Sequence, residues 1–347
     1  MKQYLNLLQN IIDNGREKES GRENMPNTIG LSKGIIEMDL QKGFPLLTTK
    51  KMYWKGIVHE LLWFLHGDTN IKYLIDNDVN IWNKDAYRWY LKAISNLKTD
   101  KEPLTIEEFV ENIKEGNLDI AGIFRYKLGD LGKVYGHQWR NQNGVDQISD
   151  CIESLQKNPY SRYHIIDAWN KADFPDMALP PCHLLYQFTV RPMTIEERRM
   201  IWNEKVKGLM FMLTWGFGKT ENDALDEQNV PKFFLDMNMY QRSCDTFLGV
   251  PFNLASMSLL LKIFARTCNM IEGVATWIGG DTHLYVDHIE LAKEQISRES
   301  YELPKLFIKK ELSNLNDILD LRIEDFELVG YKSHPAIKAE LFTGLKK

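Results

Sequence analysis

Cys182 is the residue whose surroundings first suggest chemistry. It lies in ALPPCHLLYQF, residues 178–188, between two prolines and a histidine at the head of an apolar, aromatic-rich run. A free cysteine is most often a small hydrophobic core residue. The alternative is a nucleophile presented at the start of a strand, because a thiolate can add to an electrophilic carbon. This segment alone leaves both interpretations open.

A carboxylate, Glu60, is the second candidate. It lies in GIVHELLWFLH, residues 56–66, which has the periodicity of a buried helix. The spacing places Glu60 on the apolar face of that helix, with Ile57, Leu61, Phe64 and Leu65. A carboxylate there is unfavourable unless it is paired or functional. A helix edge that reaches solvent explains the residue equally well.

The stretch YQRSCDTFLGVPFNLAS, residues 240–256, combines groups suited to an anionic ligand that carries a ring. Arg242 and Ser243 place a guanidinium beside a hydroxyl, which suits an anion, although an ordinary salt bridge is the commoner use of such an arginine. Asn253 precedes a long apolar helix, which it could cap. Its amide also offers a donor beside an acceptor, a pair that matches O4 and N3–H of uracil and mismatches cytosine.

In GGDTHLYVDH, residues 279–288, the spacing places His283 and Tyr285 on one face of an extended segment. Both could reach a sugar hydroxyl, and both could equally be satisfied core residues. His283 and His288 lack an obvious third ligand, so we expect no metal there.

The elements that position these residues are long helices alternating with short strands. The periodicity predicts helices at the N-terminus, within 56–66, from a capping box at Thr105 to Glu108, from a second one at Thr194 to Glu197, over 146–159 and over 251–268. Strands are predicted in 162–169, 184–190 and 233–241, and a loop over 130–140. This pattern predicts a single domain of mixed α/β or α+β class.

The bulk composition favours a globular protein. The 347 residues are 44% hydrophobic and 26% charged with a net charge of −5, which argues against a generally basic nucleic-acid binder. The opening MKQYLNLLQNIIDNG lacks the features of a signal peptide, and LASMSLLLKIFA is too short to span a bilayer. The four cysteines show no C-x-x-C spacing, which disfavours zinc and a disulfide framework and favours a reduced, cytoplasmic setting.

The chain resembles the thymidylate synthase family through five motifs in chain order: HELLWFLHGDTNI, DLGKVYGHQW, PPCHLLYQF, YQRSCDTFLGVPFNLAS and GGDTHLYVDH. The resemblance implies an α+β fold in which helices cover a mixed sheet, and the sheet packs against its counterpart in a homodimer. We therefore expect one catalytic domain over residues 1–347, with insertions at about 91–127 and 191–236.

Members of this family methylate dUMP with 5,10-methylenetetrahydrofolate, which supplies both the carbon and the hydride. Cys182 matches the nucleophile that adds to C6 of the uracil ring, and Arg242 would lower its pKa. Glu60 matches the general acid/base, acting through water with Tyr135 assisting. Asn253 matches the residue that reads the uracil ring.

The resemblance also implies the binding residues. The remaining nucleotide contacts are Arg22, Arg242, Ser243, Cys244, Asp245, His283 and Tyr285, with Arg162 lent by the second subunit. Arginines hold the phosphate, His283 and Tyr285 contact the ribose, and Asp245 hydrogen-bonds the pterin. The folate surroundings are Tyr53, Ile81, Trp82, Asp245, Leu248, Gly249, Phe252 and Phe342. No metal is implied.

Four features depart from the family pattern. Tyr163 stands where a second arginine is usual, ENMPNTIG follows Arg22, IWNKDAY lacks a second tryptophan, and the tail ELFTGLKK is longer and charged. Altered closure matters because water, in place of hydride, would give hydroxymethyl-dUMP. The motifs favour the synthase, and the alternative is a dUMP hydroxymethylase. A nucleotide-binding protein without catalysis is a third hypothesis, which the intact candidate residues disfavour.

Overall fold

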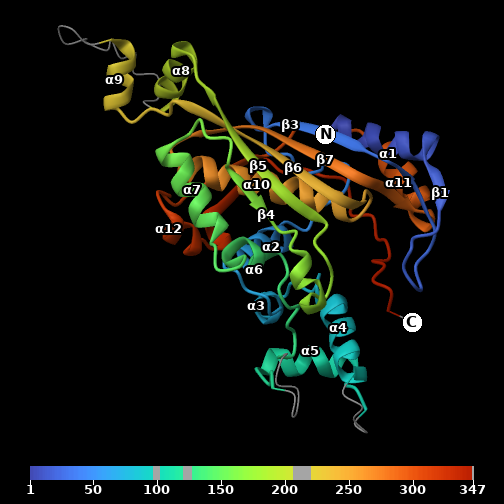
Figure 1. The fold of residues 1–347 in the computed structure, drawn as a ribbon. Coiled ribbons are helices and arrows are strands. Elements are labelled where there is room, and N and C mark those ends of the chain that lie inside the picture. The colour runs from blue at the N-terminus through green and yellow to red at the C-terminus, as the bar shows by residue number, and fades with distance from the viewer. Residues whose placement is uncertain (97–101, 120–126, 206–219, 346–347) are drawn as a thin grey trace.

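The computed structural model of the chain describes residues 1–96, 102–119, 127–205 and 220–345 (Figure 1). Helices pack on a mixed sheet, and this confirms the predicted α+β class. The strands are β1 Arg16–Lys18, β2 Thr28–Leu31, β3 Gly34–Asp39, β4 Ile165–Asp167, β5 His183–Pro192, β6 Phe233–Asp245, β7 Ile271–Tyr285, β8 Lys305–Ile308 and β9 Phe326–Val329. The helices are α1 Lys2–Asn14, α2 Trp54–Leu65, α3 Lys72–Asp76, α4 Asn83–Asn96, α5 Ile106–Glu115, α6 Tyr135–Asn141, α7 Gln147–Lys157, α8 Ile195–Lys205, α9 Glu221–Glu227, α10 Gly249–Thr267, α11 Ile289–Ile296 and α12 Leu315–Leu319.

The long strand β7 is the centre of the main sheet. Along one edge it pairs antiparallel with β3 through Val274–Gly279 and with β2 through Thr282–Tyr285. Along its other edge it pairs in parallel with β6, and β5 and β4 follow in antiparallel order. A parallel pair needs a long crossover connection, which α10 provides between β6 and β7. The sheet therefore joins segments from both ends of the chain.

Helix α10 covers one face of the sheet and is buried along most of its length. Its Phe264 ring stacks on Phe188 of β5, with ring centroids 4.8 Å apart. Burial on nearly all sides explains why the sequence shows a continuous apolar run there. The predicted helix over 251–268 is confirmed and begins two residues earlier, at Gly249.

The prediction of a loop over 130–140 is wrong in part, because helix α6 begins at Tyr135. Glycine and aromatic residues are weak helix formers, so local propensity gives little signal here. Tertiary packing overrides it: Phe64 of α2 lies 4.9 Å from the Tyr135 ring and 5.6 Å from the Trp139 ring. A Cβ on Gly136 would lie 2.8 Å from the Phe64 carbonyl oxygen, so only glycine permits this close approach of the two helices.

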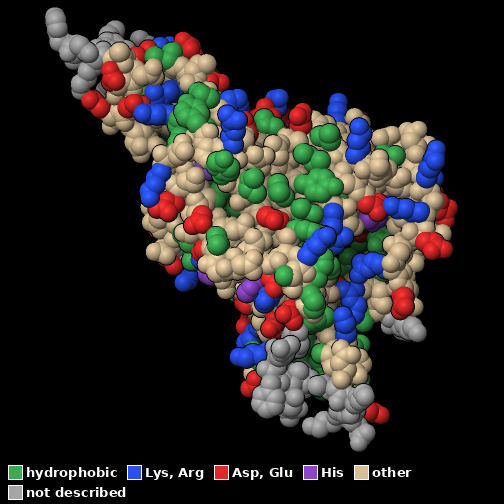
Figure 2. Space-filling view, viewed as in Figure 1, with side chains coloured by type: hydrophobic (Ala, Val, Ile, Leu, Met, Phe, Trp, Pro, Cys, Tyr) green, Lys and Arg blue, Asp and Glu red, His purple; other side chains and the backbone are tan. Residues whose placement is uncertain are grey.

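None of the described helices covers the opposite face of the sheet, and Figure 2 shows hydrophobic side chains gathered over it. The strand register aligns four apolar residues in a row across β3, β7, β6 and β5: Ile35, Ile278, Tyr240 and Leu185. Ile35 is 59% exposed and Tyr240 is 40% exposed. We call this row and its surroundings the outer sheet face.

The two predicted insertions, at about 91–127 and 191–236, differ in how they pack. Helix α5 starts with the predicted capping box at Thr105 and packs on α4, where its Phe109 ring lies 5.4 Å from Tyr87 and 5.3 Å from Tyr90. Helices α8 and α9 lie between β5 and β6, project away from the sheet in Figure 1, and share a small apolar cluster around Trp202. Residues 97–101, 120–126 and 206–219 of these two stretches lie outside the described part of the chain.

Candidate active site

Cys182 directly precedes β5 and lies beside Arg242 of β6. The backbone N–H of Arg242 donates to the Cys182 carbonyl at 2.8 Å. The guanidinium donates through Nε to the Pro181 carbonyl at 2.7 Å and through Nη2 to the Pro180 carbonyl at 2.8 Å. This geometry holds Nη2 3.9 Å from Cys182 Sγ. The two prolines that precede Cys182 in the sequence therefore hold the Arg242 guanidinium beside the thiol.

Tyr135 of α6 contacts the same segment from the other side. Its hydroxyl oxygen accepts a hydrogen bond from the Cys182 backbone N–H at 2.8 Å, and its ring stacks on His183 at a centroid distance of 4.3 Å. His183 Nδ1 lies 2.8 Å from the Tyr186 hydroxyl, and burial lowers the pKa of His183 to about 3. This imidazole is therefore neutral and supports the segment as a positioning residue. Our sequence analysis did not include His183, although its place next to Cys182 was a usable signal.

The expected lowering of the Cys182 pKa does not hold in this structure. Burial raises the pKa of the thiol, and this outweighs the opposing effects of the Arg242 charge, a hydrogen bond from Tyr135 and the Arg22 charge. The correction has a plain physical cause, since a thiolate loses more hydration on burial than these groups restore. The resting thiol therefore keeps its proton at neutral pH.

Glu60 lies on α2 and accepts a hydrogen bond from Trp82 Nε1 at 2.8 Å. Burial raises the pKa of the carboxyl to about 7, and the Trp82 bond opposes this only in part. The Trp82 ring lies 6.0 Å from the Tyr135 ring, so the carboxyl is linked to the Cys182 segment through two aromatic residues. A carboxyl with this pKa can gain or lose a proton near neutral pH.

Asn253 lies inside α10, whose N-cap is Leu248, so it does not cap the helix. Among the described residues its side-chain amide makes no hydrogen bond. The capping function belongs to Asp245, whose Oδ1 accepts from the backbone N–H groups of Phe247 at 3.1 Å and Leu248 at 3.0 Å. A Cβ on Gly249 would lie 3.9 Å from Asn253 Oδ1, so the two predicted residues are neighbours.

The parallel pairing of β6 with β7 brings two predicted groups together. Asp245 pairs with His283, whose ring lies 5.6 Å from that of Tyr285 two residues later. Ser243 lies on β6 between Arg242 and the buried Cys244. The Cys244 thiol points into the core and donates to the Gln241 carbonyl, so its side chain does not face the other predicted residues.

The two predicted phosphate arginines outside the sheet have different surroundings. Arg22 is exposed, and its charge lowers the pKa of both Cys182 and Asp85, which places it on the side of the thiol. Arg162 is exposed in the loop before β4 and forms no ion pair or hydrogen bond with any described residue. One chain therefore brings the Arg22 charge near Cys182, whereas Arg162 lies exposed beside the exposed Tyr163.

The residues predicted around the folate are partly buried side chains on the periphery of the core: Ile81, Trp82, Leu248 and Phe252. Tyr53 precedes α2, and its hydroxyl donates to the Asp78 carbonyl at 2.9 Å. Phe342 of the C-terminal tail lies against two rings of the ribose-contact region, 4.8 Å from Tyr285 and 5.1 Å from His288. The tail therefore reaches the candidate nucleotide site.

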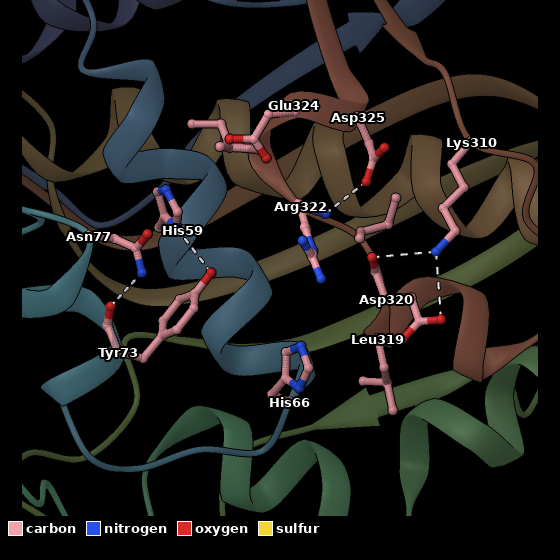
Figure 3. Close-up of a pocket in the computed structure, with 12 residues that line it drawn as sticks. His59, His66, Tyr73, Asn77, Lys310, Leu319, Asp320, Arg322, Glu324 and Asp325 are labelled. Atoms are coloured by element: carbon pink, nitrogen blue, oxygen red, sulfur yellow. Dashed lines mark hydrogen bonds and ion pairs between the residues drawn. The ribbon is translucent and has the colours of Figure 1, made fainter.

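A separate cavity of about 840 Å³ opens at α2 and contains none of the predicted residues (Figure 3). His59, the chain neighbour of Glu60, lines it and lies 2.9 Å from the Tyr73 hydroxyl through Nδ1. Lys310 and Arg322 line the side formed by the C-terminal segment. The adjacent residues His59 and Glu60 of α2 thus face different places: His59 lines this cavity, and Glu60 contacts Trp82.

The described residues contain no group of three or more His, Cys, Asp or Glu side chains that could hold a metal ion. None of the helices described is both long and apolar enough to cross a membrane.

Comparison with known proteins identifies the family. Residues 2–343 match the thymidylate synthase family. The chain is 42% identical to a thymidylate synthase of Mycoplasma mobile over 341 residues, which cover 98% of this chain and 99% of that protein. It is 41% identical to the thymidylate synthase of Malacoplasma penetrans and 40% identical to that of Mesoplasma florum, with the same coverage of both chains.

The fold, the site and these similarities define an enzyme of the methyltransferase class. More particularly, the chain belongs to the thymidylate synthase family. This family acts in dTMP biosynthesis, on dUMP, with methylenetetrahydrofolate as co-substrate.

Proposed function

We propose that this protein is a thymidylate synthase that converts dUMP and 5,10-methylenetetrahydrofolate into dTMP and dihydrofolate. The observation that carries the proposal is the approach of Arg242 Nη2 to Cys182 Sγ at 3.9 Å, with the Glu60–Trp82 pair linked to the same segment through Tyr135. A nucleophile, a cation beside it and a carboxyl that titrates near neutrality are the groups that this reaction needs.

The reaction begins when the Cys182 sulfur adds to C6 of the uracil ring and makes C5 a carbon nucleophile. C5 then attacks the methylene carbon of the folate and loses its proton, and tetrahydrofolate departs, leaving an exocyclic methylene on the ring. Hydride from tetrahydrofolate adds to that methylene as the C6–S bond breaks and the thiolate leaves. The folate is oxidised to dihydrofolate, and the methylene is reduced to methyl.

Because the resting thiol is protonated, sulfur attack requires loss of its proton. Arg242 and Arg22 stabilise the developing thiolate through their charge, and Tyr135 does so through a hydrogen bond. Glu60, with a pKa of about 7, exchanges protons with the ring through water during enolate formation and at the loss of the C5 proton.

The nucleotide is recognised by side chains of β6, α10 and β7. The unpartnered Asn253 amide pairs with O4 and N3–H of uracil, while Arg242 and Ser243 hold the phosphate. His283 and Tyr285 contact the ribose. Asp245, which already accepts two backbone hydrogen bonds at the start of α10, has a second carboxylate oxygen for the pterin. Cys244 contributes through its backbone, since its thiol is buried.

The active unit is a homodimer in which the outer sheet faces of two subunits pack together. The exposed apolar row that contains Ile35 and Tyr240 supports this arrangement, because a large exposed apolar patch marks an interaction surface. Arg162, which is without a partner among the described residues, then reaches the phosphate of the other subunit. A mixed dimer of Cys182→Ser and Arg162→Ala subunits would regain one intact site and hence activity that neither variant has alone.

The folate lies against Ile81, Trp82, Leu248, Gly249 and Phe252, with Tyr53 and Phe342 at the edges of its site. Retention of Trp82 and the close packing of Phe342 favour hydride transfer over attack by water. The four free thiols fit a reducing cytoplasm.

The deciding experiment mixes the pure protein with dUMP and 5,10-methylenetetrahydrofolate, follows dihydrofolate by absorbance and weighs the nucleotide product. Dihydrofolate together with a methylated nucleotide is expected. Tetrahydrofolate with a hydroxymethylated nucleotide would make the protein a dUMP hydroxymethylase, and binding of dUMP with no product would favour the non-catalytic hypothesis.

A further inference from the structure

Three of the segments in which this chain departs from the family pattern meet at one place in the structure. They are the loop after Arg22, helix α4, which includes IWNKDAY residues, and the C-terminal tail. Asn24 of the loop donates to the Gly344 carbonyl at 3.5 Å, and Arg88 of α4 donates to the Thr343 carbonyl. The tail therefore contacts two segments that are far apart in the sequence.

Arg88 is the residue that ties the tail to the body. Its Nη1 donates to the Thr343 carbonyl oxygen, while its Nη2 donates to Asp85 Oδ1 at 2.8 Å, one helical turn away. The Arg88 and Asp85 side chains are only 26% and 15% exposed, so the pair is shielded from bulk water. A shielded, charge-assisted contact of this kind is stronger than an exposed ion pair. Thr343 is itself buried at this contact.

The contact lies close to the reacting groups. Phe342, adjacent to Thr343, packs on Tyr285 and on His288, and the His288 Nε2 lies 3.1 Å from the Glu340 carbonyl. The Arg22 charge acts on Asp85, on Arg88 and on Cys182 alike. The tail, once fixed by Arg88, therefore covers the ribose side of the candidate site.

We propose that the Asp85–Arg88 pair is a latch that holds the C-terminal tail over the nucleotide, and that this latch excludes water while hydride is transferred. The inference rests on the proposed function. Arg88 and Asp85 are assigned as positioning residues, because the contacts of Arg88 are with the tail carbonyl and with Asp85. With the latch intact, hydride reaches the exocyclic methylene and the thiolate leaves. With the tail released, a water oxygen adds to that methylene and loses a proton as the thiolate leaves, giving the hydroxymethylated nucleotide and unoxidised tetrahydrofolate.

The test compares Arg88→Met, Arg88→Lys and Asp85→Asn with a control, Arg266→Met, which removes an exposed ion pair with Glu311 at 2.7 Å. The first readout is hydrogen exchange of the backbone amides in the last residues of the tail. We expect Arg88→Met to speed this exchange about tenfold or more, while Arg266→Met leaves it unchanged. Unchanged protection in Arg88→Met would overturn the latch.

The second readout is the product ratio. Arg88→Met is expected to lower kcat about tenfold to 100-fold and to raise the hydroxymethylated fraction from trace to on the order of a tenth. Relative to Arg88→Met, Arg88→Lys should restore part of kcat and part of the methylated fraction, because an ammonium still donates to the Thr343 carbonyl. Asp85→Asn should fall between wild type and Arg88→Met. A lower kcat with purely methylated product in every variant would refute control of water by the latch.

The two readouts separate this inference from the proposed function. Suppose that the wild-type protein forms hydroxymethyl-dUMP and that Arg88→Met still speeds exchange in the tail. The synthase assignment then fails, and Arg88 holds the tail but does not exclude water. If the wild type methylates dUMP and the tail exchanges equally in all variants, the synthase assignment stands and the latch fails.

Discussion

Two regions surround the candidate active site, and different interactions hold them. The region around Cys182 and Arg242 is fixed by strand pairing, since β5, β6 and β7 lie side by side and α10 packs beneath them. The closing region, formed by Arg22, α4 and the tail, is joined by a few side-chain hydrogen bonds to carbonyl oxygens. The strand-held region keeps the family motifs, whereas three of the four departures from the family pattern lie in the closing region. Backbone pairing tolerates little change, whereas a side-chain contact can be exchanged for another of similar strength.

The largest effect should come from the nucleophile in the strand-held region. Cys182→Ser is expected to reduce kcat about 10⁴-fold or more, because the hydroxyl is far less acidic than the thiol and the covalent step is lost. Steady-state rates and the mass of the denatured protein with dUMP bound would measure this. Cys268→Ser serves as the control, since that buried thiol lies away from Arg242. Comparable turnover in both variants would refute the covalent mechanism.

Glu60→Gln should lower kcat about 100-fold and, at the same time, stabilise the protein at alkaline pH. The folded-state pKa of about 7 lies above the ordinary carboxyl value of 4.5, so the folded protein binds more protons than the unfolded chain between these values. Stability of the wild type therefore falls as the pH rises through this window. At pH 8 the variant should gain roughly 3 kcal/mol, and below about pH 5 the gain should vanish. Urea unfolding at both pH values would check this, and an equal change at both would contradict it.

The close contact of α2 with α6 provides a structural test of the same region. Gly136→Ala places a methyl group 2.8 Å from the Phe64 carbonyl oxygen and should destabilise the fold by about 3 kcal/mol. Tyr135 would shift with α6, so kcat should fall as well. A loss in urea unfolding below about 1 kcal/mol would mean that the helices separate easily.

The smallest effect is expected in the closing region. Phe342→Ala removes ring contacts with Tyr285 and His288 and should raise the KM for the folate about tenfold, with a smaller change in kcat. Phe342→Leu, which keeps most of the apolar area, should recover much of the affinity. A KM effect on dUMP alone would place the ring on the nucleotide and away from the folate.

The residues proposed for the strand-held region could be picked out from the sequence because each lies in a short local motif. Cys182 after two prolines, Arg242 beside Ser243 and His283 two residues from Tyr285 each lie in one short motif. Strand periodicity then indicates how their side chains alternate. Helix α10 could also be predicted from the sequence, since a long apolar run is a clear signal for a buried helix.

Features that depend on tertiary packing could not be predicted from the sequence. Helix α6 forms against α2 despite weak propensity, and the raised pKa of Cys182 follows from burial that no motif reports. Arg88 and Asp85 gave no signal, because their partner Thr343 lies some 255 residues away in the chain. The side chain of Cys244 points into the core, where alternation is broken at the end of β6.

The central position of β7 also sets the order in which the protein can be completed during synthesis. β2 and β3 leave the ribosome early, yet the strand that they pair with begins at Ile271. Tyr4 of α1 likewise donates to the Thr246 carbonyl, across 242 residues. Until β7 emerges, these N-terminal strands have unpaired edges, which are prone to wrong pairing. The ribosome must therefore synthesise the chain through β7 before β2 and β3 can complete their pairing.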